Sequence, residues 1–184
     1  MKYLGIILPI LLFFAACTSP EPQKEFTGDR QFRTTDPSRL YFNNIRSTHY
    51  YRTKYKPANA DLYRHRKLSF NNKRPIIHPV IVNNWMSDEA YVFIEKNEYL
   101  EGWSDTLTVR WSQNDSIGGE YLLPVPSRPE MYAFAGKLYA AMKEGKTLEA
   151  KDAKGKFTQI LENQQDRTAF QVTLRDYYRL TEIF

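Results

Sequence analysis

Apolar and polar residues alternate most clearly in the middle of the chain. Between residues 106 and 111 every second residue is apolar, which is the period of a half-buried strand. These apolar residues are Leu107, Val109 and Trp111. The segment 112–119 contains Asn-Asp and Gly-Gly pairs, so we predict a hairpin loop that leads into a strand at 120–123.

Three other segments are predicted to be extended. The runs 76–82 and 90–94 are rich in β-branched and aromatic residues, and the stretch 48–55 is rich in tyrosine. Pro79 lies inside the first of these runs. Because proline cannot donate a backbone hydrogen bond, it indicates an edge strand or a bulge. We expect the strands to form an antiparallel meander.

The best-marked helix is predicted to begin after Ser127. Glu130 follows this serine by three residues, which is the spacing of a capping box. Pro129 stands in the first turn, where its missing N–H costs nothing, and Gly145 is expected to end the helix. The apolar residues between them form one wide stripe: Met131, Phe134, Ala135, Leu138, Tyr139 and Met142.

A second amphipathic helix is predicted over 166–181, and a hairpin from 147–151 and 156–161. Asp36 is predicted to cap a short helical turn over 38–43. The apolar face of the second helix is expected to contain Phe170, Leu174, Tyr177, Tyr178 and Thr181. The fold class is therefore expected to be α+β, with an antiparallel sheet or meander followed by two amphipathic helices with an intervening hairpin.

The first residues differ from the rest of the chain. Lys2 is followed by an uncharged apolar stretch at 4–16, and the only cysteine of the protein, Cys17, comes next. A membrane span needs roughly 20 apolar residues, so this stretch is too short to be one. A buried helix is also disfavoured, because polar and proline-rich residues follow at once.

The sequence Phe14-Ala15-Ala16-Cys17 resembles the lipidation site of bacterial lipoproteins, although that pattern usually has Leu, Val or Ile where Phe14 stands. An ordinary cleaved signal peptide is the alternative. The resemblance implies that residues 1–16 are removed and that Cys17 is acylated. Such lipoproteins carry two or three acyl chains, which would hold the protein stably on a lipid bilayer.

Location and domain organisation follow from this resemblance. Thr18 stands where an Asp often marks retention at the inner membrane, so the outer membrane is favoured, on either its periplasmic or its surface face. The polar stretch 18–37 is expected to be a flexible tether after the lipidated Cys17. Residues 38–184 are expected to form a single α+β domain. After Cys17 there is no cysteine, which excludes disulfides and thiolate metal sites from that domain.

Charge is distributed unevenly along the chain. Residues 29–74 contain 12 Lys and Arg against 3 Asp, a net charge of +9, and residues 88–130 contain 3 against 9 acidic residues, a net charge of −6. One interpretation is that the two blocks face each other or are simply solvated. The other is that the basic block binds an anionic partner, which could be lipid head groups, a polyanionic glycan or an acidic protein surface. Nucleic acid is not an expected partner of an exported protein.

The basic block also contains five tyrosines. Tyrosine rings and guanidinium groups can together stack on sugars and pair with anions, whereas tyrosines in a sheet also serve packing. The residues predicted to bind an anionic partner are Arg52, Arg64, Arg66 and Lys67.

Only one local cluster suggests a polar site outside this block. It consists of Trp85, Asp88 and Glu89, where adjacent carboxylates in a turn could share a proton or bind a cation. An acidic pair in a loop is also an ordinary surface feature. No cofactor or metal is predicted, because nucleotide-binding and zinc-binding motifs are missing and the histidines are widely spaced. The histidines are His49, His65 and His78.

Two classes of function are compatible with these features. The first is a membrane-anchored exported lipoprotein whose domain binds or assembles with a partner in the cell envelope, without catalysis. The second is a hydrolase that acts on the envelope or on glycans through carboxylates near Asp88. A catalytic site needs titratable groups that converge in a partly dry pocket, whereas a binding site exposes aromatic and arginine side chains. The sequence favours the first class.

Overall fold

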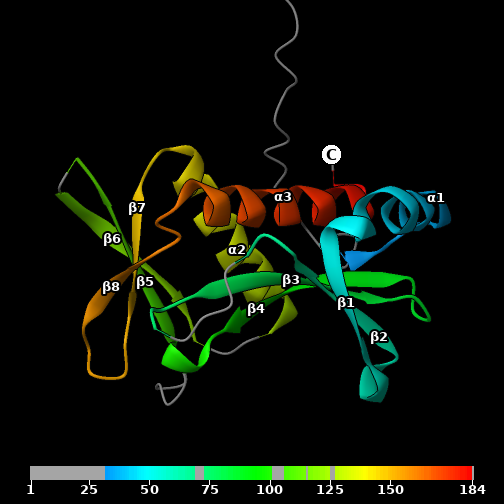
Figure 1. Ribbon diagram of the computed structural model, residues 1–184, viewed down its shortest axis with the longest axis horizontal. Coiled ribbons are helices and arrows are strands. Elements are labelled where there is room, and N and C mark those ends of the chain that lie inside the picture. Colours follow the sequence, from blue (N-terminus) through cyan, green and yellow to red (C-terminus); the bar gives the residue numbers. More distant parts are fainter. Residues whose placement is uncertain (1–31, 69–72, 101–105, 115, 125–126, 184) are drawn as a thin grey trace, which may run out of the picture.

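The computed structural model describes residues 32–68, 73–100, 106–114, 116–124 and 127–183. These residues include three α-helices and two four-stranded sheets in which all paired strands are antiparallel. The protein is therefore a mixed α+β fold, as predicted. Its strands form two separate sheets, whereas the sequence predicted one (Figure 1).

The first sheet has the strand order β1-β2-β3-β4, so each strand pairs with the next along the chain. β1 and β4 are its edges. The bounds are Tyr50–Tyr55 for β1, Ala60–His65 for β2, Ile77–Asn84 for β3 and Glu89–Lys96 for β4.

Pro79 lies in β3, which is an inner strand, so the prediction of an edge strand was wrong. The pairing between β2 and β3 ends where Arg64 stands opposite Val80. At Pro79 only β4 pairs with β3, through Ile94. The missing N–H is tolerated because the pairing between β2 and β3 ends at Val80, one residue away from Pro79.

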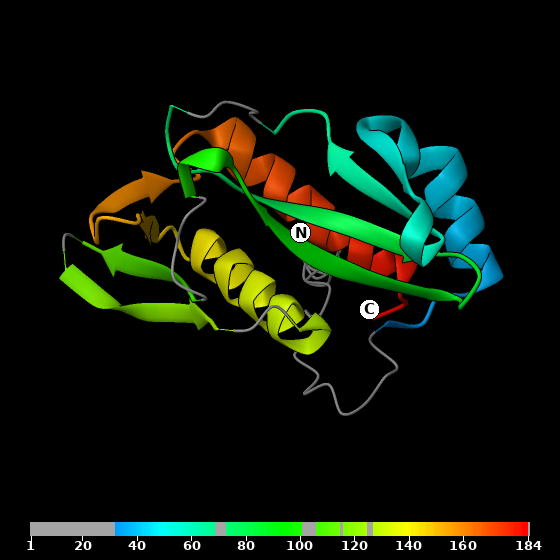
Figure 2. The same cartoon turned by 90° about the horizontal axis from the view of Figure 1, so that it is seen from below.

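The second sheet has the order β6-β5-β7-β8. It lies at the opposite end of the molecule from α1 (Figure 2). The bounds are Leu107–Gln113 for β5, Ser116–Leu123 for β6, Thr147–Lys151 for β7 and Phe157–Ile160 for β8.

Gly118 and Gly119 lie inside β6, not in the loop that was predicted for 112–119. The two glycines make room for a side chain on the neighbouring strand. A Cβ atom on Gly118 would lie 1.9 Å from the ring of Trp111, and one on Gly119 would lie 3.3 Å from it. The Gly-Gly pair therefore reflects close packing of an indole ring and not a turn.

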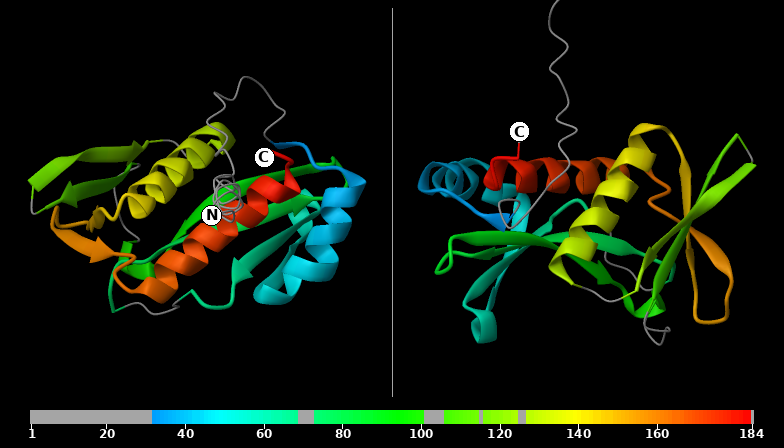
Figure 3. Two further views of the ribbon diagram at one scale, coloured as in Figure 1. Left: turned by 90° about the horizontal axis from the view of Figure 1, so that it is seen from above. Right: turned by 180° about the vertical axis from the view of Figure 1, so that it is seen from behind.

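The described residues form three α-helices: α1 (Asp36–Tyr41), α2 (Arg128–Lys143) and α3 (Gln164–Leu180), of which α2 and α3 pack on the sheets. α2 contacts β4 of the first sheet and β6 and β7 of the second, so it joins the two sheets. α3 runs along one face of the first sheet and contacts β2, β3 and β4 (Figure 3). No helix in the described part of the chain has the length and apolar character needed to cross a bilayer.

The helix ends follow local capping rules. Ser127 caps α2 and Glu130 completes the capping box, while Gly145 adopts a φ of +75° just after the helix. Thr35, and not Asp36, caps α1, because the Thr35 hydroxyl accepts a hydrogen bond from the Ser38 amide. Asp36 is instead the first helical residue, where its charge favours the helix N-terminus.

Residues 32–37 were assigned to the tether from the sequence, but they are part of the fold. Phe32 is 6% exposed and its ring packs edge-on against Tyr132 at 6.4 Å. The backbone of Arg33 forms an isolated antiparallel β-bridge with Glu89, at the start of β4. The signal segment, Cys17 and the rest of the predicted tether lie outside the described residues.

Candidate functional site

A cleft of about 510 Å³ lies at the edge of the first sheet, beside β1. After α1 the chain forms a π-helical turn, Phe42–Arg46, and a short 3₁₀ turn before it enters β1. These turns and the strand pair β1-β2 form the walls. The lining residues are Asn43, Ser47, Thr48, Tyr50, Tyr51, Arg52, Tyr63 and Arg66. π-helical turns are rare and occur often at functional sites.

Three aromatic rings attach the π-helical turn to the strands. Phe42 is buried and packs edge-on against Tyr63, at 5.0 Å between ring centroids. It also contacts Tyr50 in a tilted arrangement, at 5.8 Å. Tyr50 and Tyr63 also pack edge-on, at 6.4 Å. Such aromatic pairs stabilise a fold beyond the area they bury. This cluster fixes the distance between the two walls of the cleft.

A buried carboxylate from α3 binds Tyr50, one of the residues that line the cleft. Asp176 is 2% exposed and accepts a hydrogen bond from the Tyr50 hydroxyl at 2.7 Å. It also accepts two from the Arg46 guanidinium, at 2.8 Å from Nε and 3.0 Å from Nη2. Burial, and next the neighbouring Asp176 charge, raise the pKa of Tyr50 well above its usual value, so its hydroxyl stays a donor. The π-helical turn, β1 and α3 therefore meet at one carboxylate.

Two arginines and one exposed tyrosine lie at the mouth of the cleft. Arg52 is more than half exposed and forms an ion pair with the buried Asp61 at 2.6 Å. The Nε of Arg66 donates to the Tyr50 carbonyl at 3.2 Å, and its guanidinium lies 5.3 Å from the ring centroid of Tyr51. Guanidinium groups held beside tyrosine rings can bind carboxylates, sulfates or phosphates and stack on sugars.

Of the four predicted binding residues, the structure brings Arg52 and Arg66 together in this cleft. Arg64 is not among the lining residues, and its Nε and Nη2 donate to the two carboxylate oxygens of Glu95, each at 2.7 Å. This hydrogen-bonded pair lowers the pKa of Glu95. Lys67 also lies outside the lining, although its backbone carbonyl accepts a hydrogen bond from Gln165 of α3.

The two charge blocks of the sequence partly neutralise each other. Arg64 with Glu95, and Arg39 with Asp88, are ion pairs between the basic and the acidic block. Arg46 reaches α3 outside both blocks. The density of positive charge seen in the sequence therefore overstates the charge that remains available for a ligand.

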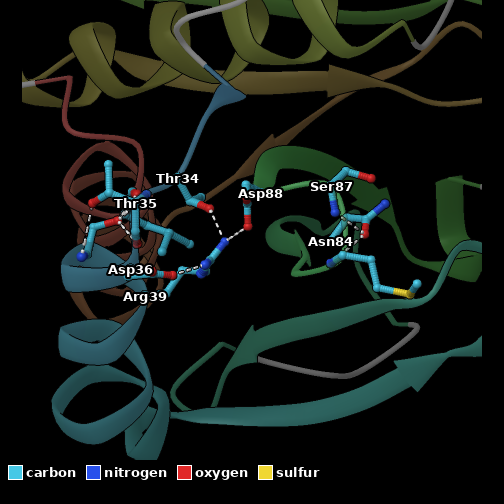
Figure 4. Close-up of polar contacts among 10 residues, drawn as sticks. Thr34, Thr35, Asp36, Arg39, Asn84, Ser87 and Asp88 are labelled. Atoms are coloured by element: carbon cyan, nitrogen blue, oxygen red, sulfur yellow. Dashed lines mark hydrogen bonds and ion pairs between the residues drawn. The ribbon is translucent and has the colours of Figure 1, made fainter.

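The second predicted cluster does not form a converging site. Asp88 pairs with Arg39 of α1, as Figure 4 shows, and Glu89 pairs with Arg128 at 2.9 Å. Trp85 is 57% exposed in the turn between β3 and β4. Because the two carboxylates have different arginine partners, the structure does not bring them together as an acid and a base.

Sequence reasoning missed Asp176 and the polar residues of the turns before β1. A signal for Asp176 was present, because it shares a helix face with Thr173 and Leu180 at spacings of three and four. A charged residue on an apolar face indicates a buried partner. The turns themselves, with Asn43, Ser47 and Thr48, carried no such signal.

The histidines do not gather at the cleft. His65 is buried, packs edge-on against Tyr50 at 5.2 Å and accepts a hydrogen bond from the Lys67 amide. Burial, and next the charge of His49, lower the pKa of His65 to about 4. In the described part of the chain, no group of three or more His, Cys, Asp or Glu residues is placed to hold a metal ion.

Comparison of the chain with protein-family models, with curated proteins and with solved structures finds no match. The site must therefore be interpreted from its own geometry.

Proposed function

We propose that this protein is a lipid-anchored protein of the cell envelope whose folded part binds a partner and does not catalyse a reaction. The sequence Phe14-Ala15-Ala16-Cys17 supports an anchor through acylated Cys17. Thr18 supports the outer membrane over the inner membrane. The ligand of the folded part is an anionic glycan of the envelope, and the cleft beside β1 is where it binds.

One observation carries the assignment of the ligand site. The cleft combines Arg52 and Arg66 with the exposed ring of Tyr51. Arginine supplies two parallel hydrogen bonds to a carboxylate or phosphate, and the tyrosine ring supplies a flat apolar surface for a sugar ring. An acidic protein surface would use the arginines but would gain less from the tyrosine.

The same cleft supports binding over hydrolysis. Glycoside hydrolysis uses two carboxylates on opposite sides of the bond that is cleaved. No carboxylate is among the residues that line this cleft in the described structure. The two carboxylates that contact lining residues, Asp61 and Asp176, are buried; Asp61 is paired with Arg52, and Asp176 with Arg46 and Tyr50. The carboxylates near Asp88 have arginine partners of their own.

Two double variants that remove the same charge test the ligand site. The first, Arg52→Gln/Arg66→Gln, removes both cations that line the cleft and keeps an amide donor for Asp61. Binding to peptidoglycan fragments and, separately, to lipopolysaccharide is measured by titration. We expect affinity for one of them to fall by about tenfold or more, because charge-assisted hydrogen bonds contribute about 1.5–3 kcal/mol each.

The control is Lys54→Gln/Lys56→Gln, which removes the same charge from exposed positions outside the lining. It should bind as the unmodified protein does. Equal losses in both double variants would show non-specific attraction and contradict the proposal. If an acidic protein binds while both glycans fail, the ligand class is wrong. The anchor is tested by radiolabelled palmitate, which should enter the unmodified protein and not Cys17→Ala.

A further inference from the structure

The turn between β3 and β4 exposes two large apolar side chains. Trp85 is 57% exposed and the adjacent Met86 is 62% exposed. The turn is held in shape because the side-chain oxygen of Asn84 accepts hydrogen bonds from the amides of Met86 and Ser87, at 3.2 and 3.3 Å (Figure 4). An exposed apolar pair on an ordered turn indicates a contact surface.

The N-terminal segment joins the fold beside this turn. The backbone amide of Thr34 donates a hydrogen bond to the backbone carbonyl of Asp88 at 2.8 Å, and the backbone of Arg33 forms a β-bridge with Glu89. Phe32 is buried, so the chain is already fixed at that residue. Whatever holds the N-terminal segment therefore also positions the turn.

The length of chain before Phe32 limits how far the turn can lie from the anchor. Residues 18–31 separate Cys17 from Phe32. A chain of this length spans at most about 50 Å when fully extended. The second sheet lies at the other end of the molecule (Figures 1 and 2). An anchor at Cys17 would thus keep the turn near the bilayer at high effective concentration, and the second sheet lies farther from the point where the chain joins the fold.

The charges around the turn are compatible with a lipid surface. Asp88 is paired with Arg39, and Glu89 is paired with Arg128. Arg33 adds an exposed cation at the point where the chain joins the fold. Both carboxylates that follow the apolar pair therefore have an arginine partner, although Arg39 is shared with Asp36, and the exposed Arg33 favours contact with anionic head groups.

We propose that the turn formed by Trp85, Met86 and Ser87 docks onto the lipid bilayer that carries the anchor. The Trp85 ring lies at the level of the head groups, where amphipathic aromatic rings are favoured, and Met86 reaches the upper acyl region. The contact orients the folded part on the membrane and directs the second sheet outward. This inference depends on the proposed anchor at Cys17.

The test uses the full acylated protein in vesicles of phosphatidylethanolamine and phosphatidylglycerol, at one protein per several thousand lipids. Because Cys17 is the only cysteine and is acylated, Met86→Cys gives a single thiol for a nitroxide label. The control is Ile117→Cys on β6, which is matched in exposure, 67% against 62%. Collision of each label with oxygen and with a water-soluble nickel chelate reports its depth. We expect the label at 86 to lose nickel collisions and gain oxygen collisions relative to the label at 117.

A second measurement uses the native side chains. Vesicles made with brominated lipids should quench tryptophan emission of the unmodified protein, and Trp85→Phe should lose most of that quenching. Equal nickel accessibility at 86 and 117 would overturn the docking proposal and leave the anchor intact. Dipolar broadening between labels at 86 would overturn it in favour of a second copy of the chain. A mass spectrum without acyl chains would reject the anchor, and the docking proposal with it.

Discussion

Asp176 offers the sharpest test of how the cleft is held together. We predict that Asp176→Ala strongly destabilises the protein. The substitution removes the acceptor of the buried Tyr50 hydroxyl and of the Arg46 guanidinium in one step. Three contacts from two different chain segments are lost.

The size of the effect follows from burial. Removing one partner of a buried ion pair costs about 3–5 kcal/mol, and an unsatisfied buried hydroxyl about 1–3 kcal/mol. The Arg46 side chain is 22% exposed and can turn partly to water. We therefore expect a loss near the lower end, about 3 kcal/mol. Asp176→Asn keeps an acceptor for Tyr50 and should lose about half as much.

The assay is urea unfolding at pH 7, followed by tryptophan fluorescence on the mature chain with Cys17→Ser. The slope of the transition should stay constant, so that the midpoint reports stability. Asp36→Ala is the control, because its ion pair with Arg39 is almost fully exposed on the Asp36 side and should be worth less than about 1 kcal/mol. A loss for Asp176→Ala no larger than for this control would refute the reasoning about the buried network.

Three further predictions concern pH, packing and capping. Because burial holds the pKa of His65 at about 4, below the 6.5 of an unfolded chain, the unfolded state binds more protons in that range. The contribution of His65 to the free energy of unfolding is therefore complete above pH 6.5 and is lost as the pH falls towards 4, by up to about 3 kcal/mol. In urea unfolding, His65→Asn should lose less stability between pH 7 and pH 4.5 than the unmodified protein. An equal loss would contradict the role given to His65. Gly118→Ala should lower the melting temperature by about 4–10 °C, because the added Cβ atom would overlap the Trp111 ring. Gly119→Ala should lower the melting temperature less. Equal effects of the two substitutions would argue against a steric clash with Trp111. Ser127→Ala should cost about 1 kcal/mol, or about 2–4 °C in a thermal melt, because α2 loses its capping oxygen, and an unchanged melt would show that the cap is dispensable.

Local sequence patterns predicted the start of α2 and part of the buried face of α3. Ser127 and Glu130 begin α2, and the apolar stripe of α3 is buried at Phe170, Leu174 and Tyr177. Caps and helical periodicity depend on residues one to four positions apart, so the sequence contains all of the relevant partners.

Strand placement was predicted less completely. The alternation in β5 was visible, but the division into two sheets was not. Pro79 indicated an edge because the register of β2 against β3 cannot be read from either strand alone. Gly118 and Gly119 were predicted to lie in a loop. The reason for their small size is the ring of Trp111 on the neighbouring strand, and this contact is not visible in the local sequence.

The candidate site likewise combines features that the sequence determines with features that only the tertiary structure decides. By itself the sequence determined the apolar stretch before Cys17, the cluster of arginines and tyrosines, and much of the helix faces. Only the tertiary structure decided that Arg64 is bound by Glu95, whereas Arg52 and Arg66 face a cleft built on Asp176. The physical reason is that an ion pair or a strand register joins residues tens of positions apart, and their distance is set by the packing of the whole fold.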